Sequence, residues 1–141
     1  MDALKEIVDY GVIGLLLVLG VVACGVAVER WRYFQRIDPA TFQHREMLEI
    51  ALTKHLVVIG TIAANAPYIG LLGTVLGIML TFYTMGTSGA LAVATIMVGL
   101  SLALKATAVG LLVAIPCVVM NNVLRRRVSE LLMRHQAHHG S

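Results

Sequence analysis

The sequence has very little charge. Charged residues make up 13% of its 141 residues, whereas hydrophobic residues make up 58%. A water-soluble domain of this size needs more charge to cover its surface, so the excess apolar area must face lipid or other subunits. Segments rich in charge, proline or serine are also missing, which argues against disorder or a long linker. These absences predict one small membrane bundle.

Acidic residues are absent from a long part of the chain, since no Asp or Glu lies between Glu49 and Glu130. Proton pumps normally use a membrane carboxylate, because its pKa can be tuned across the working range. We therefore expect the acid for any proton movement to come from another chain. Catalytic triads, paired carboxylates and phosphate-binding loops are absent too. The sequence predicts a protein that is not an enzyme and has no cofactor.

Cysteine is scarce, and both cysteines, Cys24 and Cys117, lie inside apolar runs. Two thiols within a bilayer do not form a secreted disulfide framework, so we interpret them as small packing residues. Three histidines near the C-terminus (His135, His138 and His139) have the spacing of helix metal ligands. A frayed tail is the favoured interpretation, and no metal site is predicted.

Three apolar runs are long enough to cross a membrane. Tyr10 to Val28 contains no charged residue, and as a helix it would extend about 28 Å. Between residues 55 and 123 the only ionised side chain is Lys105, in a run too long for one span. The turn composition of residues 86–89 (Gly-Thr-Ser-Gly) divides this run. We predict an all-α membrane protein in one domain, with spans at about 10–29, 57–84 and 91–122.

The remaining segments are predicted to form a small helical region outside the membrane. In the connection, residues 30–56, Asp38 is a candidate N-cap and Pro39 suits a first helical position, so we expect a helix over residues 41–55. The tail, residues 123–141, continues as an amphipathic helix. Its apolar positions share one side: Leu124, Val128, Leu131 and Leu132.

Basic residues predict the orientation. They occur in the 30–56 connection and in the 123–141 tail, and none lies between the second and third spans. Basic residues beside spans usually mark the cytoplasmic side, so we expect a periplasmic N-terminus and a cytoplasmic C-terminus. The same placement argues against nucleic-acid binding, because the basic residues adjoin apolar spans.

Small and hydroxyl residues form one stripe on each of the last two predicted spans, at intervals of three or four. The stripes comprise Ala63, Ala66, Gly70, Thr74, Gly77, Thr81 and Thr84 on one, and Gly99, Ala103, Thr107, Gly110, Ala114, Cys117 and Asn121 on the other. Such stripes allow close helix approach in lipid. We predict helix packing at Gly70, Gly73, Gly77, Gly110 and Ala114. Packing within a subunit and packing between subunits both fit this pattern, and a pore-lining role for part of one stripe is the alternative.

Two threonines in these stripes are expected at one depth, because Thr74 lies 20 positions after Lys54 and Thr107 lies 18 before Arg125. Hydroxyls at one level are candidates to relay a proton or order a water. The alternative is that each hydroxyl bonds the backbone of its own helix, which is common for membrane threonines.

Lys105 is the one charge predicted inside the second and third spans. Burying a lysine near mid-span costs roughly 2.5–3.5 kcal/mol on insertion scales, so it usually has a partner or a wet cavity. It lies about 200° around the helix from Thr107. We expect it to face a neighbouring subunit, the first span or lipid headgroups, and a snorkelling lysine without a mechanistic role is the alternative.

Two segments carry a resemblance. Residues 66–79 (APYIGLLGTVLGIM) resemble the second-span motif of the ExbB/TolQ/MotA proton-channel family. Residues 105–116 (KATAVGLLVAIP), with Asn121 following, resemble its third-span motif. Together with the order of the spans, the resemblance covers roughly residues 5–130 and is closest to a short form of the ExbB branch.

The resemblance implies an inner-membrane pentamer around the helices of an ExbD-type single-span partner, which carries the membrane Asp. The pair would use the proton motive force to drive a TonB-type protein that energises outer-membrane transport. Thr74 and Thr107 match the threonines thought to line the family's proton route. The family often has a Glu five positions before the second of these threonines, where this chain has Leu102. The alternatives are a passive oligomeric scaffold and a TolQ-like role in envelope maintenance.

Overall fold

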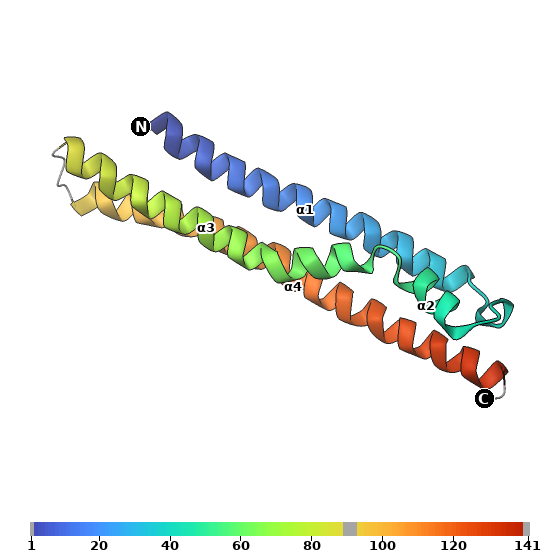
Figure 1. Ribbon diagram of the computed structural model, residues 1–141. Coiled ribbons are helices and arrows are strands. Elements are labelled where there is room, and N and C mark those ends of the chain that lie inside the picture. The colour runs from blue at the N-terminus through green and yellow to red at the C-terminus, as the bar shows by residue number, and fades with distance from the viewer. Residues whose placement is uncertain (1, 89–92, 140–141) are drawn as a thin grey trace.

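The computed structural model describes residues 2–88 and 93–139, which form four α-helices and one short 3₁₀ turn (Figure 1). In chain order the elements are α1 (Asp2–Arg36), η1 (Pro39–Thr41), α2 (Arg45–Thr53), α3 (Leu56–Ser88) and α4 (Val93–His138). Three of the helices contain segments long and apolar enough to cross a membrane: Glu6–Arg36, Leu56–Thr87 and Val93–His138. The predicted all-α fold with three long apolar helices is confirmed.

The three long helices lie side by side along the molecule. Helices α3 and α4 run in opposite directions as a long hairpin, and α1 lies along it with its C-terminal end near α2 (Figure 1). The contacts between them form three apolar clusters along the bundle, the middle one built on Ala23, Ile62, Ala63 and Cys117. Large apolar side chains such as Val21 and Leu112 remain exposed on the outside of the bundle. Such a surface suits lipid or neighbouring subunits.

The end of α3 differs from the predicted turn, because the helix continues through residues 86–88. The Thr87 hydroxyl donates hydrogen bonds to the carbonyl oxygens of Tyr83 (3.1 Å) and Thr84 (3.2 Å). These bonds satisfy carbonyls that a helix end otherwise leaves without partners, and so they stabilise the last turn. Residue 89, and residues 91 and 92 at the start of the predicted third span, lie outside the described residues.

The connection between α1 and α3 has less helix than predicted. Asp38 does act as a cap, since its carboxylate accepts a hydrogen bond from the backbone amide of Ala40 at 3.0 Å. The capped segment is only one 3₁₀ turn, because the backbone of Phe42 is extended. Helix α2 ends at Thr53, and His55 adopts a left-handed φ of 67° between α2 and α3. The left-handed residue ends the helix and redirects the chain.

The tail is helical, as its amphipathic pattern predicted, and the structure shows that it packs against the connection. Its four apolar residues (Leu124, Val128, Leu131 and Leu132) are buried in one cluster with Phe34 of α1 and with Leu48 and Leu52 of α2. His135 is buried as well, and its Nε2 lies 2.9 Å from the carbonyl oxygen of Phe42. That nitrogen must donate, because a carbonyl oxygen only accepts. The prediction of a frayed tail is therefore wrong, since α4 is anchored at His135.

Arg30, the first residue of the predicted connection, lies near the end of α1 and is buried, with 3% of its surface exposed. Its guanidinium donates hydrogen bonds to the carbonyl oxygen of Ala51 (2.8 Å) and to the Glu29 carboxylate, and it lies 4.4 Å from the centroid of the Tyr33 ring. A hydrogen bond from a charged group contributes about 1.5–3 kcal/mol. Arg30 thus ties the end of α1 to α2.

Replacing Arg30 with methionine is expected to lower the free energy of unfolding by about 1.5–3 kcal/mol, because Ala51 loses its charged donor. Thermal unfolding of the detergent-solubilised protein measures the loss, and cleavage of the 37–55 region by trypsin should accelerate. Arg32→Met is the matched control, since Arg32 is exposed two residues away on the same helix. Equal destabilisation by the two substitutions would contradict the anchoring role.

Candidate functional site

The site lies where the backbones of α3 and α4 approach each other closely. A Cβ atom on Gly70 would be 2.7 Å from the carbonyl oxygen of Ala106 and 3.1 Å from the Cα of Gly110. A Cβ atom on Gly110 would be 2.8 Å from the carbonyl oxygen of Ala66. Real Cβ atoms do not approach backbone so closely, so glycine at both positions is what brings the two backbones together.

Thr74 and Thr107 meet directly across this contact. Their hydroxyl groups are hydrogen-bonded to each other. The Thr74 hydroxyl oxygen is also 2.9 Å from the carbonyl oxygen of Ala103, and the Thr107 hydroxyl oxygen is 3.4 Å from the carbonyl oxygen of Gly70. Each carbonyl belongs to the opposite helix. The alternative in which each hydroxyl bonds only its own helix is therefore not what the structure has.

The contacts form a short chain that can be polarised in two directions. A hydroxyl group has one hydrogen to donate, so two hydroxyls can satisfy only two of the three contacts at once. In one arrangement Thr74 donates to Thr107, which donates to Gly70. In the other Thr107 donates to Thr74, which donates to Ala103. Rotation of the two hydroxyls interconverts the arrangements, which is the chemical requirement for passing a proton along hydrogen-bonded groups.

The threonine pair is enclosed mainly by small and apolar groups. Thr74 is 6% exposed, and Thr107 is half-buried. About two turns before Thr74 on α3, Ala66 packs with Leu16 of α1 and Ala114 of α4 in an apolar cluster. Thr74 is therefore shielded within the protomer, and the exposed part of Thr107 is the side from which a water or another proton-exchanging group can reach the pair.

The other predicted packing residues also make contacts within the protomer. A Cβ atom on Gly73 would be 2.8 Å from both Ala106 and Val12, and one on Gly77 would be 2.9 Å from Ala103. The small stripes of α3 and α4 thus face each other, and α1 packs beside them.

Lys105 does not join this site. It is exposed on α4, two residues before half-buried Thr107, and it takes part in none of the ion pairs found in the described part of the chain. Its ammonium group is therefore available to something outside the protomer.

Asp9, near the start of α1, is a candidate site residue that was not predicted from the sequence. One of its carboxylate oxygens, Oδ1, would be 3.9 Å from a Cβ atom on Gly77, one helical turn from Thr74. Oδ1 is buried and, in the described structure, has no hydrogen-bond partner. The predicted first span began at residue 10 and so left Asp9 out. Helical spacing could have identified Asp9, because it lies on the same face of the helix as the inward-facing Val12 and Leu16.

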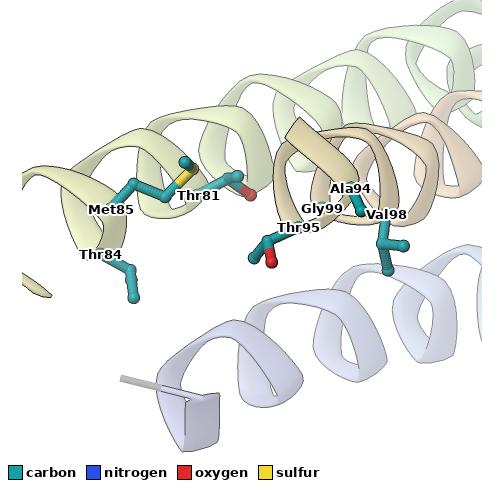
Figure 2. A pocket seen from close by; sticks show the side chains of 7 residues that line it. All are labelled: Thr81, Thr84, Met85, Ala94, Thr95, Val98 and Gly99. Atoms are coloured by element: carbon teal, nitrogen blue, oxygen red, sulfur yellow. The ribbon is translucent and has the colours of Figure 1, made fainter. Parts of the chain in front are cut away.

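A pocket lies beyond Asp9, toward the tip of the α3–α4 hairpin. Its volume is about 370 Å³, and Thr81, Thr84 and Thr95 contribute hydroxyl groups to its lining. Figure 2 shows Thr81 of α3 and Thr95 of α4 extending into the space between the two helices. The hydroxyl of Thr81 donates to the carbonyl oxygen of Gly77 at 2.8 Å. Polar side chains thus continue along α3 from Thr84 to Thr74.

The comparisons with known proteins agree with this architecture. A protein from Aquifex aeolicus (strain VF5) named biopolymer transport protein ExbB is 50% identical over 140 residues, which cover 99% of this chain and 95% of that protein. A protein of the same name from Helicobacter pylori (strain J99 / ATCC 700824) is 48% identical over 127 residues, or 90% of this chain and 88% of that protein. The Tol-Pal system protein TolQ of Pseudomonas aeruginosa is 39% identical over 87 residues, covering 62% of this chain and 38% of TolQ.

A family model gives the same result over most of the chain. The model described as the MotA/TolQ/ExbB proton channel family matches residues 32–137, which include α2, α3 and nearly all of α4. With three apolar helices long enough to span a bilayer, the protein is a multi-pass membrane protein. It therefore belongs to the MotA/TolQ/ExbB proton channel family, whose ExbB members serve biopolymer transport.

Proposed function

We propose that this chain is the proton-channel subunit of a motor that uses the proton motive force to energise outer-membrane transport through a TonB-type protein. The observation that carries the proposal is the Thr74–Thr107 pair, whose hydrogen bonds can be polarised in either direction. It lies between two helices that are themselves apolar enough to cross the membrane. A relay of this kind lets a proton pass where bulk water cannot.

The energy source is sufficient for a mechanical step. One proton crossing 100 mV releases about 2.3 kcal/mol from the electrical term alone. In the proposed complex, five copies of this chain form a ring around the membrane helix of an ExbD-type protein. The Asp of that partner exchanges protons with the threonine pair, and the change in its charge moves the partner helix within the ring.

The proposed setting is the bacterial inner membrane, with the N-terminus in the periplasm and the C-terminus in the cytoplasm. Support comes from the connection and the tail, which both carry basic residues and lie at the same end of the bundle (Figure 1). The exposed apolar side chains along the helices suit contact with lipid and with neighbouring copies. We propose no enzymatic activity, cofactor, metal or nucleic-acid partner, because a relay needs none of them.

The competing function is a passive ring that only holds another membrane protein, and a TolQ-like role in envelope maintenance is a variant of the motor. Native mass measurement discriminates motor from scaffold. The protein is co-expressed with the single-span, Asp-bearing protein of a neighbouring gene and purified in detergent. We expect the mass of five copies plus one to three partner chains. A bare oligomer that never retains the partner, although both are expressed, would contradict the motor.

A further inference from the structure

Asp9 is half-buried and presents one carboxylate oxygen, Oδ1, to the inside of the bundle. It lies on the face of α1 that packs on the hairpin, where Val12, one turn further along, meets Gly73. The absence of a side chain at Gly77 leaves room beside the Asp9 oxygen, which is buried without a hydrogen-bond partner.

The depth of Asp9 places it at the outer edge of the hydrocarbon. Asp9 precedes Glu29, the next acidic residue of α1, by 20 residues, or about 30 Å of helix, which matches the thickness of the hydrocarbon core. Helix α3 continues for 11 residues beyond Gly77, about 16 Å, so the hairpin extends past Asp9. Asp9 is thus at the level where a proton would leave outside water and enter the membrane.

Polar groups lie along α3 on both sides of Gly77, the residue beside Asp9. On the outer side Thr81, which lines the 370 Å³ pocket, donates to the carbonyl oxygen of Gly77, the residue that Asp9 faces. On the inner side Thr74 is one turn from Gly77 and bonds to Ala103, which also touches Gly77. The pocket, the carboxyl group and the threonine pair therefore follow one another along α3.

Few other charged groups lie near Asp9. On its own helix Lys5 and Glu6 are within about one turn, and Glu6 is exposed. Helix α3 has no titratable residue between Tyr68 and Tyr83. In the described part of α4 the only charged residue before Arg125 is Lys105, which is exposed. No cation of the described structure pairs with the buried oxygen of Asp9.

We propose that Asp9 is the proton-accepting group at the outer entrance of the proton route. Its carboxylate takes a proton from a hydronium ion in water that enters the pocket lined by Thr81, Thr84 and Thr95, and a neutral water remains. The resulting carboxylic acid releases the proton to a water bonded to Thr74, so that one O–H bond forms and another breaks in each step. This inference rests on the proposed function, because it supplies the outer end of the same relay.

The test separates the protonation of Asp9 from the function of the complex. Infrared difference spectroscopy during a pH change, on the detergent-solubilised protein alone, should show the carbonyl band of a buried carboxylic acid. The band should disappear in Asp9→Asn and persist in Glu6→Gln, the exposed acid nearby. In the complex with the Asp-bearing partner in liposomes, Asp9→Asn should lower proton flux by about tenfold, roughly 1.4 kcal/mol in barrier height. Asp9→Glu should restore much of it.

Three results would overturn the proposal. If Asp9→Asn leaves the infrared spectrum unchanged, the carboxyl group does not exchange a proton, even if Thr74→Val still blocks flux and the proposed function stands. If Lys105→Met reproduces the effect of Asp9→Asn and the double variant regains flux, Asp9 is half of an ion pair between neighbouring protomers. Loss of flux in Thr74→Val with normal flux in Asp9→Asn would place the entrance elsewhere.

Discussion

Replacing Thr74 with valine is expected to reduce proton-driven transport by about tenfold or more, because the relay loses a hydroxyl that contacts both Thr107 and Ala103. Losing one hydrogen bond of about 1.4 kcal/mol from a rate-limiting step lowers the rate by a factor of ten. Valine has nearly the shape of threonine, so the packing of α3 on α4 should change little. Proton flux into liposomes containing the complex with its Asp-bearing partner measures the effect.

Serine is the discriminating control at the same position. Thr74→Ser keeps the hydroxyl and removes a methyl group, so flux should remain within a few-fold of the unsubstituted protein. Thr107→Val should resemble Thr74→Val, and the double substitution should add little, because the two hydroxyls act as one chain. Silent valine substitutions at both positions, with the partner still bound, would favour the passive scaffold.

Most of the fold could be predicted from the lengths of the apolar segments and from the spacing of apolar residues along them. An apolar segment that crosses a bilayer has few alternatives to a helix, because its backbone groups must be hydrogen-bonded internally. The equal depth of Thr74 and Thr107 also followed from counting residues to the nearest basic groups. The tail was predictable because Leu124 and Val128 recur at helical spacing, and the structure buries both.

The contacts between different helices could not be predicted from the sequence. Direct bonding between Thr74 and Thr107 requires the close approach at Gly70 and Gly110, and a glycine stripe does not reveal which helix it faces. Asp9 was not predicted as a site residue because a charged residue at the end of an apolar run usually lies in water. The burial of Arg30 was not predicted either, because it depends on a hydrogen-bond acceptor that another helix supplies.

Adding one methyl group at Gly70 is expected to separate the two helices. The Cβ atom of alanine would lie 2.7 Å from the carbonyl oxygen of Ala106, 3.1 Å from the Cα of Gly110 and 3.2 Å from the Cα of Thr107. All three are backbone atoms, so no side-chain rotation relieves the overlap. Overpacking of this kind costs about 1–3 kcal/mol. Thermal unfolding of the detergent-solubilised Gly70→Ala protein should reveal that loss.

Gly86→Ala is the matched control, because it makes the same chemical change in the same helix where a Cβ atom meets nothing within 4 Å. It should be neutral or slightly stabilising, since alanine favours helix by up to about 1 kcal/mol over glycine. Gly70→Ala should also lower proton flux, because Thr74 and Thr107 extend from the backbones that it pushes apart. Equal stability of the two variants would mean that α3 and α4 do not touch at Gly70. The relay would then lack the close approach on which its hydrogen bonds depend.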